Sequence, residues 1–316
     1  MNTLFYSLVL LAGILLVVAY LTWLERKFAG RMQSRIGPQR VGKPWGLLQP
    51  IADGAKLLVK EDIIPQATDK TAYNLAPIVV ILATTLVFVT IPLGKSVVLV
   101  DLNVGVLFIL AISSLALIGI FMAGWGSANK YAILSAMRGV NQLISYEIPL
   151  VLACLVPVIL AGSMKLSSIV LAQSKVWFIF YPFLGQIAFL IFLVSALAEA
   201  NRIPFDITEA ESELIAGYTV EYSGMKFAFL WLAEYIHLLA VSLVGSILFL
   251  GGWNGPWLPS GLWLALKTLL LFLLILWIRW SLVRIRLDQI LALSWKVLFP
   301  LSLATLILAG GWSFIF

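Results

Sequence analysis

The 316-residue sequence contains one cysteine and one histidine, and only 11% of its residues are charged. Cys154 lies in an apolar run and His237 is isolated, so this chain alone cannot build a disulfide framework, a zinc site or an iron–sulfur cluster. Soluble domains carry about a quarter charged residues. The shortage of charge therefore excludes an ordinary soluble protein, and any redox centre must belong to a partner.

Apolar residues are abundant: 62% of the chain is hydrophobic and the mean hydropathy is +1.04. A helix crosses the bilayer core with about 20 apolar residues. The sequence predicts an all-α polytopic membrane protein that forms a single domain over 1–316. A closed barrel is excluded, because the apolar windows are continuous and do not alternate. The predicted spans are 4–24, 74–92, 103–123, 140–162, 177–199, 227–250, 262–280 and 290–312.

Basic residues give the predicted orientation. Of the 21 Lys and Arg residues, all except Lys95, Lys165, Lys175 and Lys267 fall in or beside the loops after the odd-numbered spans. These loops cover residues 25–73, 124–139, 200–226 and 281–289. The positive-inside rule places such loops in the cytoplasm and both termini on the outer side. The basic balance is explained by topology, and no soluble basic domain is present to hold nucleic acid.

The first cytoplasmic loop contains a predicted amphipathic surface helix that begins near Leu47. Its apolar residues share one arc, whereas Asp53 lies on the opposite, polar arc. Such a helix suits the bilayer interface, and a lipid-headgroup anchor is one interpretation of the loop. The alternative is that Asp53 covers Glu25 and Arg26 at the end of the first span, so that charges from two elements line one cavity for an amphipathic substrate.

Two acids, Glu147 and Glu234, fall inside predicted spans. A charge at that depth costs about 2.5–3.5 kcal/mol on insertion scales, so each needs a reason. His237 follows Glu234 by three residues, on the same helical face and within expected hydrogen-bond reach. The two interpretations are a structural role, such as a snorkelling acid or a Glu–His clamp, and an ion path.

The stretch AEANRIPFDITEAESELIAGYTVEYSG, from residue 198 to 224, concentrates carboxylates around Arg202. Acidic runs are usually solvated, but apolar residues such as Phe205 and Tyr218 are interleaved here, which predicts packing against protein. Crowded, partly desolvated carboxylates should have raised pKa values, as a proton relay requires. We expect the relay to lead toward Glu147 and Glu234. The acids of the stretch are Glu199, Asp206, Glu209, Glu211, Glu213 and Glu221.

Three runs together resemble a known family. They are ERKFAGRMQSRIGPQRVGKPWGLLQPIADGAKLLVKED, NQLISYEIP and the 198–224 stretch. In order, spacing and eight-span topology they are similar to the membrane subunit of respiratory complex I that is called the H subunit in bacteria and subunit 1 in mitochondria. The resemblance covers most of the chain, although the first 20 and last 60 residues are too generic to contribute.

The resemblance implies that the chain forms the membrane floor of a quinone chamber and docks a peripheral arm. It implies a quinone-binding set of Glu25, Arg26, Arg35, Asp53, Phe205 and Asp206. It also implies a proton pathway that contains Glu147, Glu199, Glu209, Glu211, Glu213, Glu221 and Glu234. The chain itself would hold no metal and no catalytic residue, and its enzyme class would be that of the whole NADH:quinone oxidoreductase, a translocase.

The implied substrate is quinone, and the implied cofactors, iron–sulfur clusters and FMN, belong to partner subunits. Expected partners are the peripheral quinone-site subunits and the small membrane subunits that connect to antiporter-like pumps. The expected location is the inner (plasma) membrane of a cell, with an energy-converting organelle membrane as the alternative. Two other functions stay open: the homologous subunit of an energy-converting hydrogenase, and a stand-alone ion transporter. A transporter often shows an internal repeat, and none is visible.

Overall fold

The computed structural model describes residues 2–95, 97–208 and 215–315. Within these ranges the chain is helical and has no strand. Seven helical segments are long and apolar enough to cross a membrane, which confirms the all-α polytopic fold. They are α1 (Asn2–Met32), α3 (Lys70–Leu86, continued by the 3₁₀ turn Val87–Val89), α4 (Gly105–Gly126), α5 (Lys130–Ala161), α9 (Gly224–Phe249), α10 (Ser260–Ser281) and the continuous segment α11 (Leu287–Leu293), π-helix Ser294–Leu298 and α12 (Phe299–Ile315).

The predicted span over 177–199 forms a shorter helix than expected. The sequence predicts one helix over 177–199, but α7 covers only Leu184–Glu199. A 3₁₀ turn, Phe178–Phe180, precedes it, and Phe183 has a φ of 63°. Pro182 lies between the two segments and cannot donate a helical backbone hydrogen bond. The chain therefore bends here, and α7 is a short apolar helix of 16 residues.

Helix α1 continues past its predicted end at residue 24 and reaches Met32. The added residues, ERKFAGRM, include several good helix formers, and the next proline is Pro38. Glu25 and Arg26 are predicted to stand where the loop begins, but they lie on the helix. Their side chains are consequently held on two different faces of a rigid element.

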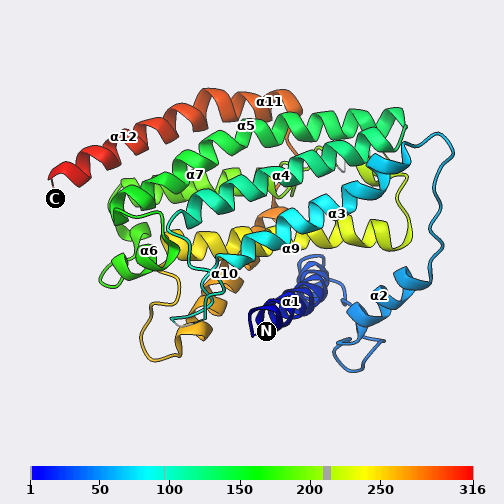
Figure 1. Cartoon of the computed structure of the whole chain (residues 1–316), viewed down its shortest axis with the longest axis horizontal. Coiled ribbons are helices and arrows are strands. Elements are labelled where there is room, and N and C mark those ends of the chain that lie inside the picture. Colours follow the sequence, from blue (N-terminus) through cyan, green and yellow to red (C-terminus); the bar gives the residue numbers. More distant parts are fainter. Residues whose placement is uncertain (1, 96, 209–214, 316) are drawn as a thin grey trace.

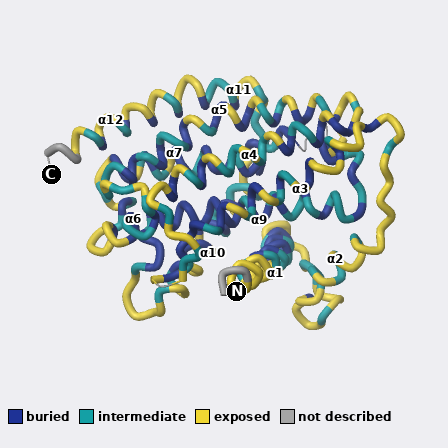
Figure 2. Tube along the Cα trace, viewed as in Figure 1, coloured by how far each residue is buried: buried dark blue, intermediate teal, exposed yellow. Residues whose placement is uncertain are grey.

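The bundle is centred on two helices (Figure 1). Helix α5 packs against α4, α7 and α12, and α9 packs against α3, α10 and α1. In the apolar central stretch of α9, 67% of the residues are buried, which is the largest fraction among the seven spans. In Figure 2 the buried residues line the inner faces of these helices, while the outer faces of α1 and α12 are exposed. Polar side chains on α5 and α9 therefore lie in the interior.

Helix α2 (Gln49–Val59) is the predicted amphipathic surface helix and lies at the edge of the bundle, where it contacts α1 and α9 (Figures 1 and 2). None of its residues is buried, and Ile51 and Leu58 are 63% and 68% exposed. An apolar face without protein cover suits a position at the bilayer interface. A further short helix in the described ranges, α6 (Leu166–Ala172), also lies outside the seven spans.

The described part of the acidic stretch packs against α5, as its interleaved apolar residues predicted. Gln142 donates from Nε2 to the carbonyl oxygens of Ala198 and Phe205, both at 2.7 Å. Ser135 donates to the carbonyl oxygen of Thr208 at 2.6 Å. These bonds satisfy buried carbonyl groups and fix the segment on the inner side of α5. It continues through the 3₁₀ turn Gly217–Thr219 to α9.

Candidate functional site

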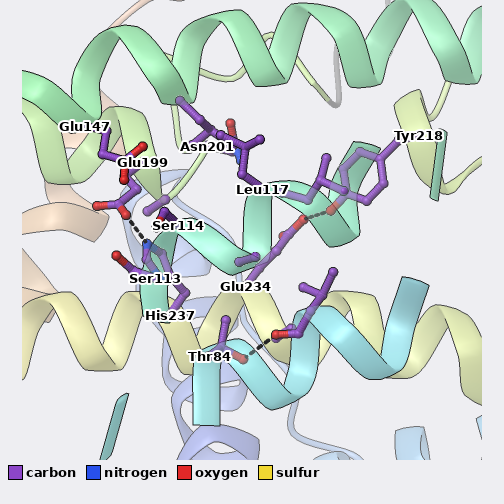
Figure 3. A pocket seen from close by; sticks show the side chains of 16 residues that line it. Thr84, Ser113, Ser114, Leu117, Glu147, Glu199, Asn201, Tyr218, Glu234 and His237 are labelled. Atoms are coloured by element: carbon purple, nitrogen blue, oxygen red, sulfur yellow. Dashed lines mark hydrogen bonds and ion pairs between the residues drawn. The ribbon is translucent and has the colours of Figure 1, made fainter. Parts of the chain in front are cut away.

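A partly open cavity lies where α3, α4, α5, α7 and α9 meet (Figure 3). About 50 Å³ is open to the centres of water molecules, and one water needs about 10–15 Å³ on this measure, so the cavity has room for a few waters. Its polar and ionisable lining comprises Thr84, Ser113, Ser114, Glu147, Glu199, Asn201, Tyr218, Glu234 and His237. Three acids of the predicted pathway thus share one cavity.

Glu199 and His237 face each other across the cavity, one at the end of α7 and the other on α9. The Nε2 atom of His237 lies 4.0 Å from a carboxylate oxygen of Glu199, and each side chain is 12% exposed. This arrangement corrects the expected Glu234–His237 clamp. His237 and Glu234 both line the cavity, but the carboxylate nearest to Nε2 is that of Glu199. The packing of α7 against α9, which no local spacing encodes, places Glu199 opposite His237.

Glu147 on α5 lies beside Glu199 in Figure 3. Ser114 and Ser113, consecutive residues of α4, provide hydroxyl groups next to Glu147 and Glu199 respectively. A hydroxyl group can donate a hydrogen bond to a carboxylate and can also accept one from a protonated carboxyl group. The two acids therefore sit in a protein environment that can hydrogen-bond either protonation state.

Glu234 lies at the other end of the cavity, and its partners include Tyr218 and Arg202. The hydroxyl of Tyr218 donates to it at 3.0 Å, and Nη2 of Arg202 lies 3.8 Å from its second oxygen. Arg202 is 5% exposed at its side chain. Its guanidinium carbon also lies 4.7 Å from the ring centre of Tyr235, the residue after Glu234. Arg202 therefore contacts two neighbouring side chains that leave α9 in different directions.

Tyr235 leads from the cavity to a second cluster of charges, on α1 and α10. Its hydroxyl lies next to Glu25, and Arg279 is close to both. Glu25 is 4% exposed and forms an ion pair with Arg279 of α10. A buried carboxylate needs such a partner. Sequence reasoning missed Arg279, whose only sequence signal is a charge at the end of an apolar span.

Arg26 and Asp53 form an ion pair between α1 and α2, in agreement with the expected position of Asp53 over the end of the first span. Nη1 of Arg26 lies 2.5 Å from Asp53, which also accepts a hydrogen bond from Gln49 at 3.1 Å. The side chains are 41% and 23% exposed. Arg26 and Asp53 thus fasten α2 across the charged end of α1, and the adjacent Glu25 points to the interior.

The remaining predicted residues are dispersed. Phe205 is buried and its ring packs 5.3 Å from that of Tyr146, whereas Asp206 is half-buried beside it. Glu221 accepts a hydrogen bond from Asn129 at 2.7 Å, and it is not among the residues that line the cavity. Arg35 lies in a separate groove on another face of α1. Glu209, Glu211 and Glu213 lie outside the described residues.

A metal centre has no ligand set here, because the described residues include no group of three His, Cys, Asp or Glu side chains that could hold an ion. The chemistry that the cavity offers is proton exchange among carboxylates, an imidazole, a phenol and water. The fold and the site together define a polytopic helical membrane protein with an acid cavity that contacts, through Arg202 and Tyr235, a charged cluster near one membrane surface.

Comparison with known proteins identifies the family. A family model described as NADH dehydrogenase matches residues 5–310, so the chain belongs to this family. A relative from Dehalococcoides mccartyi (strain CBDB1), named as the H subunit of NADH-quinone oxidoreductase, is 50% identical over 98% of this chain and 86% of its own length. A relative from Syntrophobacter fumaroxidans, also named as an H subunit of NADH-quinone oxidoreductase, is 48% identical over 96% of this chain and 93% of its own. A third, from Geobacillus kaustophilus and named in the same way, is 48% identical over 97% and 93%.

Proposed function

We propose that this chain is the membrane subunit of an NADH:quinone oxidoreductase that forms the floor of the quinone chamber and couples quinone reduction to proton translocation. The names of its relatives support the enzyme complex. The chain itself performs no redox step in this proposal. Its residues bind and orient the quinone and respond to the charge that quinone reduction creates.

The quinone side of the proposal uses the charged end of α1 and the start of the acidic stretch. The Arg26–Asp53 pair would face the bound headgroup, and Asp206 would contribute from the acidic stretch. Glu25 points to the interior, where it would respond to the charge of the headgroup through its ion pair with Arg279. Phe205 would support the acidic stretch through its contact with Tyr146. Arg35 was expected in the same set, but it lines a groove that is distinct from this cluster, so this proposal gives it no contact with the quinone.

The proposed coupling between the quinone and the acid cavity depends on the position of Arg202. This position is the main observation behind the proposal. Arg202 lies between Tyr235, whose hydroxyl is next to Glu25, and Glu234, which lines the acid cavity. A change of charge near Glu25 would alter the electrostatic attraction between Arg202 and Glu234, and with it the protonation of Glu234. Glu234, Glu199 and Glu147 would then exchange protons through the few waters for which the cavity has room. Glu209, Glu211, Glu213 and Glu221 would supply protons to this relay.

The partners, cofactors and location that we propose for the chain are those of the whole enzyme complex. Partners would be the peripheral quinone-site subunits, including the one with the terminal iron–sulfur cluster, and small membrane subunits that lead to antiporter-like pumps. FMN and the clusters would belong to those partners. We place the chain in the cell's inner (plasma) membrane, with both termini outside and the charged end of α1 in the cytoplasm.

The test is the substitution Glu147→Gln in the intact complex, with Asp288→Asn as the matched control. Asp288 pairs only with Arg286 among the described residues, and both are 81% exposed. We expect Glu147→Gln to lower inhibitor-sensitive quinone reduction and proton pumping together, about tenfold or more. Electron transfer from NADH to an artificial acceptor should be unchanged in both variants. Full pumping in Glu147→Gln would refute the relay.

A further inference from the structure

A groove on the outer face of α1 is separate from the acid cavity and from the Glu25 cluster. It lies between α1, the loop that follows it and α10, and about 420 Å³ is open to the centres of water molecules. The acid cavity offers about 50 Å³ on the same measure. The groove is therefore large enough for a sizeable chemical group, and the proposed quinone chemistry leaves it without a role. Its wall includes Trp23, Lys27, Arg31, Arg35, Trp45 and Leu273.

The charge in the groove has one sign. Lys27, Arg31 and Arg35 line it, and none of the described lining residues is acidic. Across the described ranges, no carboxylate forms an ion pair with any of these three side chains. Arg35 donates from Nε to Gln33 at 2.6 Å, which holds it in place without neutralising it. A concave site with three uncompensated cations attracts an anion.

The groove is built into the chain and does not depend on a flexible loop. The indole N–H of Trp23 donates to the carbonyl oxygen of Trp45 at 3.2 Å, which ties the loop to α1. Gly37 lies so close to α1 that a Cβ there would meet the backbone of Arg26 and Lys27 at 3.1 Å. A Cβ at this distance would be tighter than an ordinary contact, so glycine favours the close approach of the loop to α1.

The depth of the groove is that of the lipid headgroups. Its cations begin directly after the charge-free run from Leu4 to Leu24. Two tryptophans flank them, as is common at membrane interfaces. Toward the apolar end of α1 the groove continues over Leu24 and Leu273, and Tyr20 and Leu269 beyond them are 38% and 40% exposed. A ligand that fits has an anionic head and an apolar tail.

We propose that this groove binds the phosphate of an anionic phospholipid, with its acyl chains lying along α1 and α10. Lys27 and Arg31 contact the phosphate, and the indole rings of Trp23 and Trp45 cover the glycerol region. A neutral quinone headgroup has no use for three cations, so the groove is not a second quinone site. The inference goes beyond the proposed function and does not rest on it.

The experiment uses the full chain, purified in mild detergent with the subunits that accompany it and placed in phosphatidylcholine nanodiscs. Trace photoactivatable phosphatidylglycerol is added, and crosslinks are mapped by mass spectrometry. We expect crosslinks within residues 23–45. Each basic residue near an anionic surface adds about fivefold to affinity, so Lys27→Gln with Arg31→Gln should reduce this labelling about 30-fold. Photoactivatable phosphatidylcholine should label the segment far less than the anionic probe does.

Controls separate the sources of binding. The double substitution of Lys56 and Lys60 by Gln removes two exposed charges at the C-terminal end of α2 and should leave labelling unchanged. Lys27→Arg with Arg31→Lys keeps the charge and should retain it, which guards against misfolding. Equal labelling of the Gln variant and the unmodified chain would overturn the proposal. The proposal would also be overturned if soluble glycerol phosphate, at the same concentration as the lipid, competed with the labelling. Equal labelling by phosphatidylcholine, or occlusion of the groove by an accompanying subunit, would overturn it as well.

Discussion

The Nη2 atom of Arg202 lies 3.8 Å from the carboxylate of Glu234, and both side chains are largely buried. The pair joins the acidic stretch to α9 at the mouth of the acid cavity. Its position gives the guanidinium two tasks: it compensates a carboxylate inside the bundle, and it touches the ring of Tyr235 on the side of Glu25. Energetic coupling between Arg202 and Glu234 is therefore measurable apart from any catalytic assay.

A double-mutant cycle tests this coupling. Removing one partner of a buried pair costs about 3–5 kcal/mol, because the other charge stays buried without compensation. We expect Arg202→Gln to lower the stability of the purified chain by about 3 kcal/mol and the double variant with Glu234→Gln to recover much of that loss. Denaturant unfolding in detergent measures it. Additive losses in the double variant would show that the two residues act independently.

The Arg26–Asp53 pair yields a prediction about quinone binding. Because it fastens α2 over the charged end of α1, we expect Asp53→Asn to raise KM for a short-chain quinone about three- to tenfold, with a smaller change in kcat. The exchange Arg26→Asp with Asp53→Arg should restore part of the affinity. Lys56→Gln, at an exposed position on the same helix, serves as the control. A change confined to kcat would contradict a positioning role for α2.

The sequence predicted those parts of the site that depend on local patterns. Asp53 was expected near α1 because helical periodicity places it on the polar arc of α2, and the Arg26–Asp53 contact agrees with that expectation. The Glu25–Arg279 pair joins residues 254 positions apart. No spacing rule connects them, since the pairing depends on how α1 and α10 pack. Likewise, helical spacing suggested Glu234 for His237, but the bend before α7 brings Glu199 to it instead.

The stability that α3 receives from its N-cap residue should depend on pH. Asp69 is the N-cap of α3, and hydrogen bonds from the hydroxyl and N–H groups of Thr71 hold the pKa of its carboxyl below the usual 3.8. A lowered pKa in the folded chain means that the cap stabilises fully above 3.8 and loses its contribution as pH falls through the folded pKa. We expect Asp69→Ala to lower the unfolding temperature at pH 7 but to differ less from the unmodified chain near pH 3.

Asp69→Asn is the matched control for that prediction, because asparagine caps helices nearly as well and does not titrate. Its unfolding temperature should therefore lack the part of the pH dependence that comes from this site. Unfolding of the three proteins can be followed by circular dichroism in detergent between pH 7 and pH 3. A constant difference between Asp69→Ala and the unmodified chain over that range would show that the ionised carboxylate is not what stabilises the cap.

Lys267 provides the last prediction, at the opposite end of the bundle from the quinone cluster. Its ammonium group is buried and donates to the carbonyl oxygens of Leu250, Gly252 and Asn254, at 2.6, 2.9 and 2.6 Å. The ring centre of Trp177 lies 4.1 Å away and adds a cation–π contact. Lys267→Met would keep the length of the side chain but leave three carbonyl groups without their donor, at a cost of about 3 kcal/mol in unfolding free energy. Lys165→Gln, which breaks an exposed ion pair with Asp101, should cost less than about 1 kcal/mol. Equal losses in the two variants would mean that the turn after α9 is held by its own backbone and not by the ammonium group.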